Sequence, residues 1–374
     1  MKSNRDEALE GLRGLAVLAV VFCHISELCI HYDLWESKFW AGACGAHLLL
    51  VICGYSMAAM LAQSSSNAIS FARKRLHKVY PSYALAIVIS GALIILFHPP
   101  LYSISISQLL ANLTMCQSWL GQPDIDGAYW LTAVLLKFNV LVAVAIAFQL
   151  NGKRGEWFAY GYLALILALR LAPTFGVELP GSMGRSFNIQ HAHLFIAGMM
   201  LWHMQHCGNT SLRTAAFATC VGIESLGASM PWGSFVIVLL MIVALIRHDL
   251  RIFSVRPLVA VGRCSHMIYM LHGVICYVVM KYALMAGSTV TVAILASYVV
   301  VLATSHYLTN CLTSSTQELA MANGGGDTAI TETGNSAELE LQTLTRLNEI
   351  NEFSSASPDV SSEESALHAH HGSR

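Results

Sequence analysis

The stretch GLRGLAVLAVVFCHISELCI, residues 11–30, indicates the fold class of this chain. It is almost entirely apolar, and its length is about the 20 residues that a helix needs to cross a hydrocarbon core of roughly 30 Å. No small-residue cleavage site follows it, so we expect a retained membrane span and not a cleaved signal peptide.

The composition extends this interpretation to the whole chain. Of 374 residues, 55% are hydrophobic and 11% charged, and the mean hydropathy is +0.56, whereas soluble domains contain about 25% charged residues. The sequence therefore predicts an all-α integral membrane protein with about ten transmembrane helices. Apolar windows place these helices near residues 12–31, 44–62, 79–97, 128–150, 157–172, 189–205, 212–229, 232–248, 262–284 and 288–310.

Charge divides the chain in two. Residues 1–311 contain 19 Lys+Arg and 12 Asp+Glu, and residues 312–374 contain 2 and 10. We interpret residues 1–311 as a membrane-embedded domain and the acidic, Ser-rich residues 312–374 as a disordered tail. With the N-terminus inside, 14 of the 19 Lys and Arg residues of the first part lie on the cytoplasmic side and five lie outside or within spans. Both termini are therefore expected in the cytoplasm, in the plasma (inner) membrane. This balance excludes a nucleic-acid partner bound through excess positive charge.

Motifs for metal binding are missing from the sequence. The ten cysteines form no C-x-x-C pair, and His191 and His193 would point to different sides of a helix. We expect no metal site and no bound cofactor. The sequon at Asn112 lies in a predicted outer loop and would be open to glycosylation.

Several ionisable residues fall inside predicted spans, where they are costly and are candidates for function. Arg13 and His24 are eleven residues apart, which places them on one helix face about 16 Å apart. Lys137 and Glu224 are candidates to pair with each other. One predicted span carries a polar stripe at i, i+4 and i+7, formed by Ser265, Tyr269 and His272. His24 and His272 could each have a catalytic role or could form hydrogen bonds that join neighbouring helices.

Five ordered patches resemble the acyltransferase-3 family of multi-span membrane O-acyltransferases. They are RDEALEGLRGLAVLAVVFCH (residues 5–24, an Arg-x10-His motif), LLLVICGYSM (48–57), the basic loop SFARKRLHKVYPSY (70–83), YWLTAVLLKFNVL (129–141) and VGRCSHMIYMLH (261–272). The chain departs from the family pattern at three positions, because Leu135 replaces a Glu, Cys53 a Ser and Asn139 an aromatic residue.

The resemblance implies transfer of an acyl group, expected to be acetyl, from an acyl-CoA to a hydroxyl group of a saccharide, glycolipid or similar acceptor. It implies that His24 is the catalytic base, with Arg13 at the donor. The basic residues Arg73, Arg75 and Lys78 would bind phosphates, although short cytoplasmic loops are basic in any case. Trp130 and Lys137, with the polar stripe, are candidates for the acceptor side. Two alternatives are open: a non-catalytic family member that binds CoA or a partner, and a transporter with histidines in its spans.

Overall fold

The described part of the chain is helical. A computed structural model describes residues 4–36, 42, 44–63, 67–99, 101–150, 154–178, 180, 188–227 and 251–322. The span expected at 232–248 and the tail beyond residue 322 lie outside them. The helices are α1 (Asn4–His31), α2 (Cys44–Gln63), α3 (Ala68–Phe97), α4 (Ile106–Leu113), α5 (Tyr129–Ala147), α6 (Gly155–Leu171), α8 (Ala192–His206), α9 (Ser211–Gly227), α11 (Arg256–Arg263), α12 (Ser265–Met285) and α13 (Val290–Ala322), with 3-10 turns η3 (Ala172–Phe175) and η4 (Arg251–Phe253).

Seven helices among the described residues are long and apolar enough to cross a bilayer. They are α1, α2, α3, α5, α6 (continued to Phe175), α12 and α13. These helices support an integral membrane protein. The expected spans at 189–205 and 212–229 are the shorter helices α8 and α9.

The basic segment 70–83 is helical, which corrects the expectation of a loop. Helix α3 begins at Ala68, where the side chain of Asn67 accepts a hydrogen bond from the Ser70 N–H at 2.8 Å. Pro81 therefore lies inside the helix instead of beginning one. A proline at this position removes one backbone donor, and α3 continues through it to Phe97. At the other end of the domain, α13 continues beyond Cys311 to Ala322.

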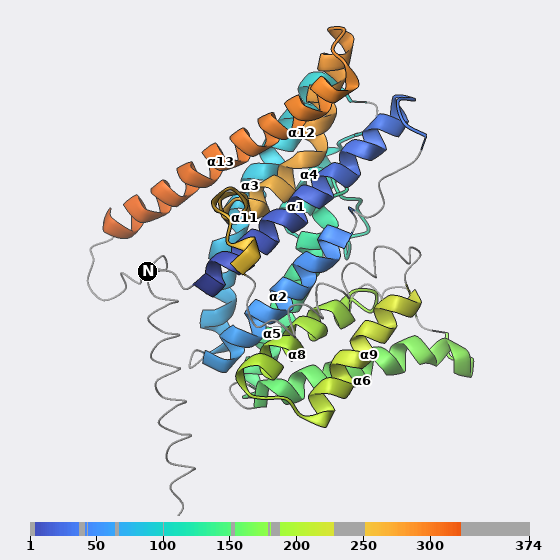
Figure 1. Ribbon diagram of the computed structural model, residues 1–374, viewed down its shortest axis with the longest axis vertical. Helices are drawn as coiled ribbons and strands as arrows, with labels where there is room; N and C mark the ends of the chain where they lie inside the picture. The colour runs from blue at the N-terminus through green and yellow to red at the C-terminus, as the bar shows by residue number, and fades with distance from the viewer. Residues whose placement is uncertain are drawn as a thin grey trace, which may run out of the picture. The chain divides into compact units, whose positions relative to one another are not determined.

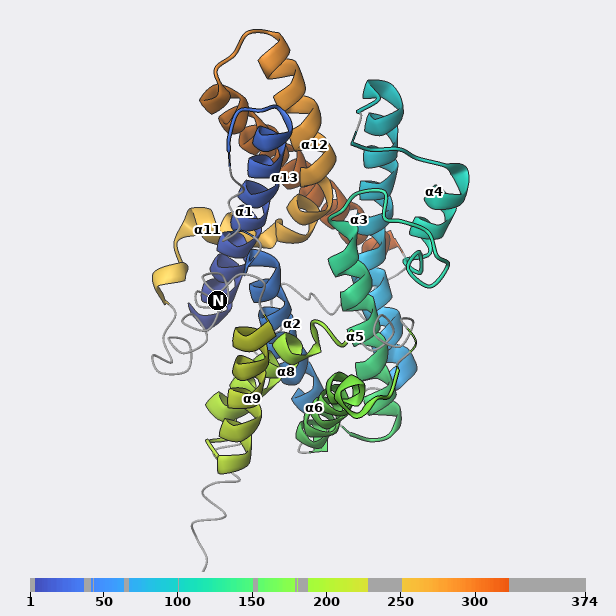
Figure 2. The same cartoon turned by 90° about the vertical axis from the view of Figure 1, so that its right-hand side faces the viewer.

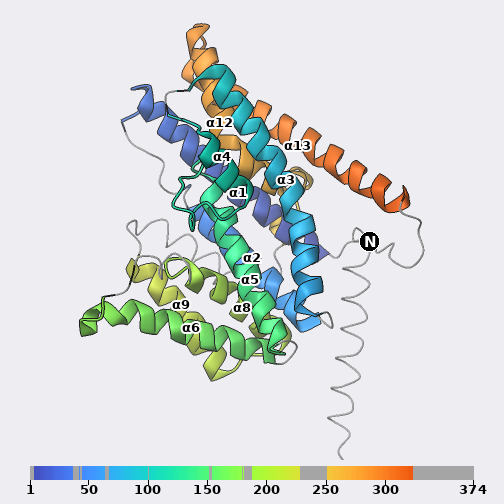
Figure 3. The ribbon, with the colours of Figure 1, turned by 180° about the vertical axis from the view of Figure 1, so that it is seen from behind.

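Two close helix crossings organise the described unit (Figure 1). The backbones of α2 and α8 approach each other closely where the two helices cross. Gly54 faces the Phe195 carbonyl and Gly198 faces the Val51 carbonyl, and neither glycine has room for a Cβ. Helix α12 packs against α1, α3 and α13. Figure 2 shows α3 beside α5 and α1 beside α12. The view from behind in Figure 3 shows α6, α8 and α9 gathered at one end of α2 and α5.

Helices α8 and α12 form the centre of this packing. Residues 192–204 of α8 are all buried, as is most of α12 from Met267 to Tyr277. Leucine, methionine and aromatic side chains from the neighbouring helices surround them. Histidines on these two helices are therefore placed inside the protein.

Candidate active site

His24 and His272 meet where α1 packs against α12. Their ring centroids are 4.8 Å apart, with an angle of 57° between the ring planes. The sequence predicted each of them separately as a candidate, 248 positions apart in the chain. The tertiary structure brings the two imidazoles into one site.

The ring of His24 is held by a carboxylate of its own helix. Nδ1 of His24 lies 2.8 Å from Oε2 of Glu27, one helical turn further on. When Nδ1 carries the proton and donates to Glu27, the lone pair is on Nε2. The side chain of His24 is 35% exposed and that of Glu27 is 40% exposed, so a substrate can reach this imidazole.

In contrast to His24, the side chain of His272 is completely buried. Its Nδ1 lies 2.7 Å from the backbone carbonyl of Tyr269 and donates to it. The lone pair is then on Nε2, which is buried and has no hydrogen-bond partner among the described residues. A buried polar atom of this kind costs free energy until a ligand or water satisfies it. His272 thus offers an unused acceptor beside His24.

Asp126 is a third ionisable group at this site, which the sequence analysis missed. It is buried in the loop before α5, and its carboxylate accepts hydrogen bonds from the N–H groups of Ala128 (2.9 Å) and Val274 (3.1 Å). Val274 follows His272 by two residues, so this carboxylate ties the loop to the histidine-bearing turn of α12. Burial raises the pKa of Asp126, while the two N–H donors and His24 act in the opposite direction.

Asn112 fixes the loop that carries Asp126, and this corrects the glycosylation expectation. Its side chain is fully buried, donates to the carbonyls of Gln108 (2.8 Å) and Pro123 (3.0 Å), and accepts from the N–H of Ile125 (3.2 Å). The amide is therefore closed to a glycan. It serves to shape the chain directly before Asp126.

The predicted cationic residues occupy different places. Arg13 pairs with Glu10 at 2.7 Å and donates to the Ser56 hydroxyl at 3.1 Å, which fixes α1 to α2. Arg75 is half-buried and points to the thioethers of Met57 (3.7 Å) and Met60. Arg73 and Lys78 are exposed on the same helix.

The remaining predicted residues divide between two places. Tyr269 lies beside His272, with 5.7 Å between ring centroids, whereas Trp130 lies against His191, at 4.9 Å. Lys137 lies over the ring of Trp119, at 5.6 Å. Ser265 begins α12, two turns before His272.

Glu224 joins a second histidine cluster. Its two carboxylate oxygens contact Nδ1 of His47 at 2.9 Å and Nε2 of His193 at 2.8 Å. The contacts connect α2, α8 and α9 at one buried point. These histidine partners of Glu224 were not predicted from the sequence.

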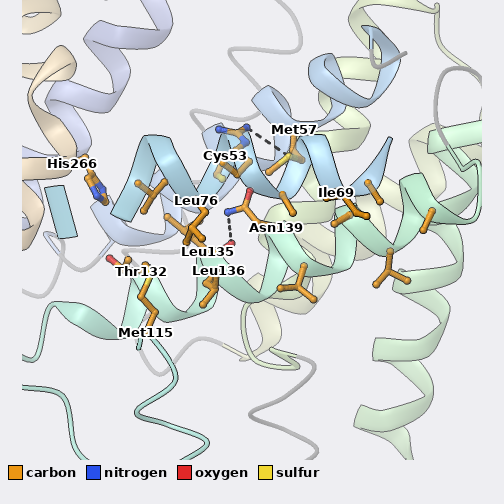
Figure 4. A pocket seen from close by; sticks show the side chains of 18 residues that line it. Cys53, Met57, Ile69, Leu76, Met115, Thr132, Leu135, Leu136, Asn139 and His266 are labelled. Carbon is orange, nitrogen blue, oxygen red and sulfur yellow. Dashed lines mark hydrogen bonds between the residues drawn. The ribbon is translucent and has the colours of Figure 1, made fainter. Parts of the chain in front are cut away.

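A largely apolar pocket of about 470 Å³ lies between α3 and α5 (Figure 4). It holds all three positions at which the chain departs from the family pattern, Cys53, Leu135 and Asn139. Four polar side chains reach it, those of Arg75, Thr132, Asn139 and His266, and hydrocarbon or sulfur-containing side chains form the rest of the wall. Arg75 thus belongs to this pocket, whereas the sequence placed it in a basic loop as a candidate for phosphate contacts.

Metal ligands are not gathered anywhere in the described ranges. Within them, no group of three or more His, Cys, Asp and Glu side chains could hold a metal ion. The ten cysteines are all free thiols.

Of the residues missed from the sequence, one carried a signal. His24 and Glu27 are three positions apart, a spacing at which side chains on a helix are neighbours. Asp126 carried none, because it lies in an irregular loop and joins the site only where that loop packs against α12.

Comparisons with known proteins identify the family of this chain. A family model described as an acyltransferase domain matches residues 6–309. Acyltransferase MdmB of Streptomyces mycarofaciens is 30% identical to this chain over 132 residues, which make up 33% of this chain and 34% of that protein. The match thus spans about a third of the length of this relative. No solved structure matches the chain. Since the matched residues 6–309 cover most of the chain and include His24, Asp126 and His272, this protein belongs to the acyltransferase-3 family.

Proposed function

We propose that this protein transfers an acyl group from a CoA thioester to a hydroxyl group of a membrane-accessible acceptor. The observation that carries the proposal is the setting of His24. Its accessible imidazole is held by Glu27, and its ring centroid lies 4.8 Å from that of the second imidazole, His272. An oriented, neutral histidine is suited to take a proton from a hydroxyl near pH 7.

His24 acts as the general base in this mechanism. Nε2 of His24 removes the proton of the acceptor hydroxyl while the hydroxyl oxygen attacks the carbonyl carbon of the thioester. The tetrahedral intermediate then breaks its carbon–sulfur bond. The imidazolium returns the proton to the leaving sulfur, so the products are an ester and a free thiol. Glu27 keeps the imidazole in the reactive tautomer and stabilises its positive charge.

His272 and Asp126 have supporting roles. Nε2 of His272 accepts a hydrogen bond from a second, neighbouring hydroxyl of the acceptor, which positions the attacking hydroxyl beside His24. Asp126 interacts electrostatically with His24, and a negative charge near a base favours the protonated form that the mechanism requires. Its two backbone donors hold the carboxylate in place.

The basic residues of α3 favour an anionic donor. Arg75 and Lys78, with Arg73, are suited to phosphate contacts because such hydrogen bonds are charge-assisted. We propose a saccharide or glycolipid as the acceptor. Saccharides carry many hydroxyl groups and glycolipids reside in the bilayer, and both properties suit the exposed base of a membrane protein. The proposed location is the plasma (inner) membrane, with both termini in the cytoplasm.

His24→Gln tests this function. Glutamine keeps a polar side chain that forms hydrogen bonds but takes up no proton near pH 7, and loss of a general base costs about 10²–10⁴ in rate. The variant should insert and bind donor normally, yet transfer almost no labelled acyl group in membranes of matched protein content. His272→Gln is the comparison variant, and we expect it to raise the acceptor KM more than it lowers kcat.

Near-wild-type turnover of His24→Gln would contradict the assignment of the base. Donor-induced thermal stabilisation of the wild type without any product would favour a non-catalytic member of the family. Uptake of a solute into vesicles without acylation would favour a transporter.

A further inference from the structure

Two buried polar atoms in the pocket between α3 and α5 lack a partner. They are Oδ1 of Asn139 and Nε2 of His266, which have no hydrogen-bond partner among the described residues. The amide nitrogen of Asn139 donates to the Leu135 carbonyl at 2.8 Å, which leaves the oxygen as the group to be satisfied. Most of the remaining wall is hydrocarbon and cannot satisfy either atom.

The pocket extends along α5, and one end lies against α12. Its α5 wall extends from Thr132 to Ala147, a length of about 22 Å at the helical rise. Figure 4 shows Thr132 and His266 at one end, Ile69 toward the other and Asn139 between them. His266 precedes His272 by six residues of α12, or about 9 Å along the helix.

This arrangement selects the chemical class of the occupant. A plain hydrocarbon chain would fill the apolar wall but leave Asn139 and His266 unsatisfied. A free sugar would place hydroxyl groups against leucine, valine and methionine side chains. A thin chain with methyl groups and amides at intervals satisfies both kinds of wall, and Arg75 favours an anionic end.

We propose that this pocket binds the pantetheine arm of the thioester donor. Oδ1 of Asn139 accepts a hydrogen bond from an amide N–H of the arm, and Nε2 of His266 bonds to a second polar group nearer the thioester. The inference rests on the proposed function and adds how the donor is recognised. The arm occurs both in CoA and on acyl carrier proteins, and either source would use the same contacts.

A series of donors with one acyl group and shortened arms tests the proposal. The thioesters are those of CoA, pantetheine, N-acetylcysteamine and a simple alkyl thiol without amides. For the wild type we expect kcat/KM to fall at each step. Asn139→Leu should lower kcat/KM about five- to tenfold with the amide-bearing donors, as for loss of one hydrogen bond, and leave the alkyl thioester unchanged. His266→Leu should show the same selectivity.

Leu141→Met is the matched control, because residue 141 lies on α5 with Asn139 but does not line the pocket; it should keep the wild-type donor profile. Asn139→Thr retains a hydroxyl oxygen as an acceptor and should recover part of the loss, which separates recognition from misfolding. Equal losses on every donor, or a rise in acceptor KM alone, would overturn the proposal. The second result would place a chain of the acceptor in the pocket.

Binding separates this proposal from the proposed function. CoA lacking its sulfur cannot be acylated, so its binding to purified protein is measured without turnover. We expect Asn139→Leu to weaken this binding about five- to tenfold and Leu141→Met to leave it unchanged. If binding follows this pattern while no thioester is turned over, the proposed acyl transfer is contradicted but the proposed binding of the pantetheine arm is supported. Equal binding by both variants would overturn the arm site. Comparing acyl-CoA with an acylated carrier protein then identifies the source of the arm.

Discussion

The carboxylate of Asp126 fills the space in which a side chain at residue 273 would begin. A Cβ built on Gly273 would lie 2.3 Å from Oδ2 and 2.5 Å from Oδ1 of Asp126. Oδ2 also accepts a hydrogen bond from the N–H of Val274, so the carboxylate has little freedom to move aside. The glycine after His272 thus lets the loop before α5 close over the site.

Gly273→Ala should therefore displace Asp126 and disturb the site. We expect a loss of stability of about 1–3 kcal/mol, typical of overpacking, and a clear fall in transfer rate. Thermal unfolding in detergent and the transfer assay measure the two effects. Gly222→Ala on α9 is the control, because nothing lies within 4 Å of its Cβ position. If both variants behave alike, the close contact has no role in the site.

Asp126→Asn separates the charge of this residue from its shape. Asparagine has one acceptor oxygen where two backbone N–H groups need partners, and an unsatisfied buried donor costs about 1–3 kcal/mol. Loss of the negative charge also disfavours protonated His24, so the rate should fall even where the protein is fully folded. The measurement is kcat at a temperature well below unfolding. Unchanged kcat together with reduced stability would make Asp126 a purely structural residue.

Glu27→Gln tests the orientation of His24. Gln can present an amide N–H to Nδ1, which favours the wrong tautomer and places the proton on Nε2. In a buried catalytic triad the equivalent change lowers kcat by about 10⁴. Glu27 is 40% exposed, so we expect a smaller loss of about 10- to 100-fold. Donor binding should be unchanged, and a wild-type rate would show that Glu27 does not orient the base.

Charge reversal on α3 tests the donor contacts. The double variant Arg75→Glu, Lys78→Glu should raise the donor KM by about tenfold or more, since a charge-assisted hydrogen bond contributes about 1.5–3 kcal/mol. Lys74→Glu, also exposed on α3, controls for a general effect of charge on insertion. The test compares donor KM at equal membrane content. An equal rise of the donor KM in the double variant and in Lys74→Glu would mean that the basic residues of α3 act only on membrane topology.

The sequence by itself determined the membrane class and the helical nature of the chain, and it marked His24 and His272 as candidate site residues. Long apolar windows have few stable alternatives to a helix in a bilayer, because every backbone polar group must be bonded internally. Arg13 and His24 were predicted from spacing along one helix, which is a local property. The same local reasoning would have found Glu27. The helix expected at 79–97 begins earlier, at Ala68, because the side chain of Asn67 caps it there. Pro81, a residue type common at helix starts, therefore lies inside α3.

Only the tertiary structure decided which distant groups meet. His24, Asp126 and His272 come from three separate segments, and their meeting depends on how α1, α5 and α12 pack. The same is true of Glu224, which is bound by His47 and His193. It is also true of the pocket, where Cys53 of α2 lies in the same lining as Leu135 and Asn139 of α5. Apolar periodicity specifies that a helix is buried but not its neighbour, since one hydrophobic face packs against many others; the small residues and hydrogen bonds at each crossing make that choice.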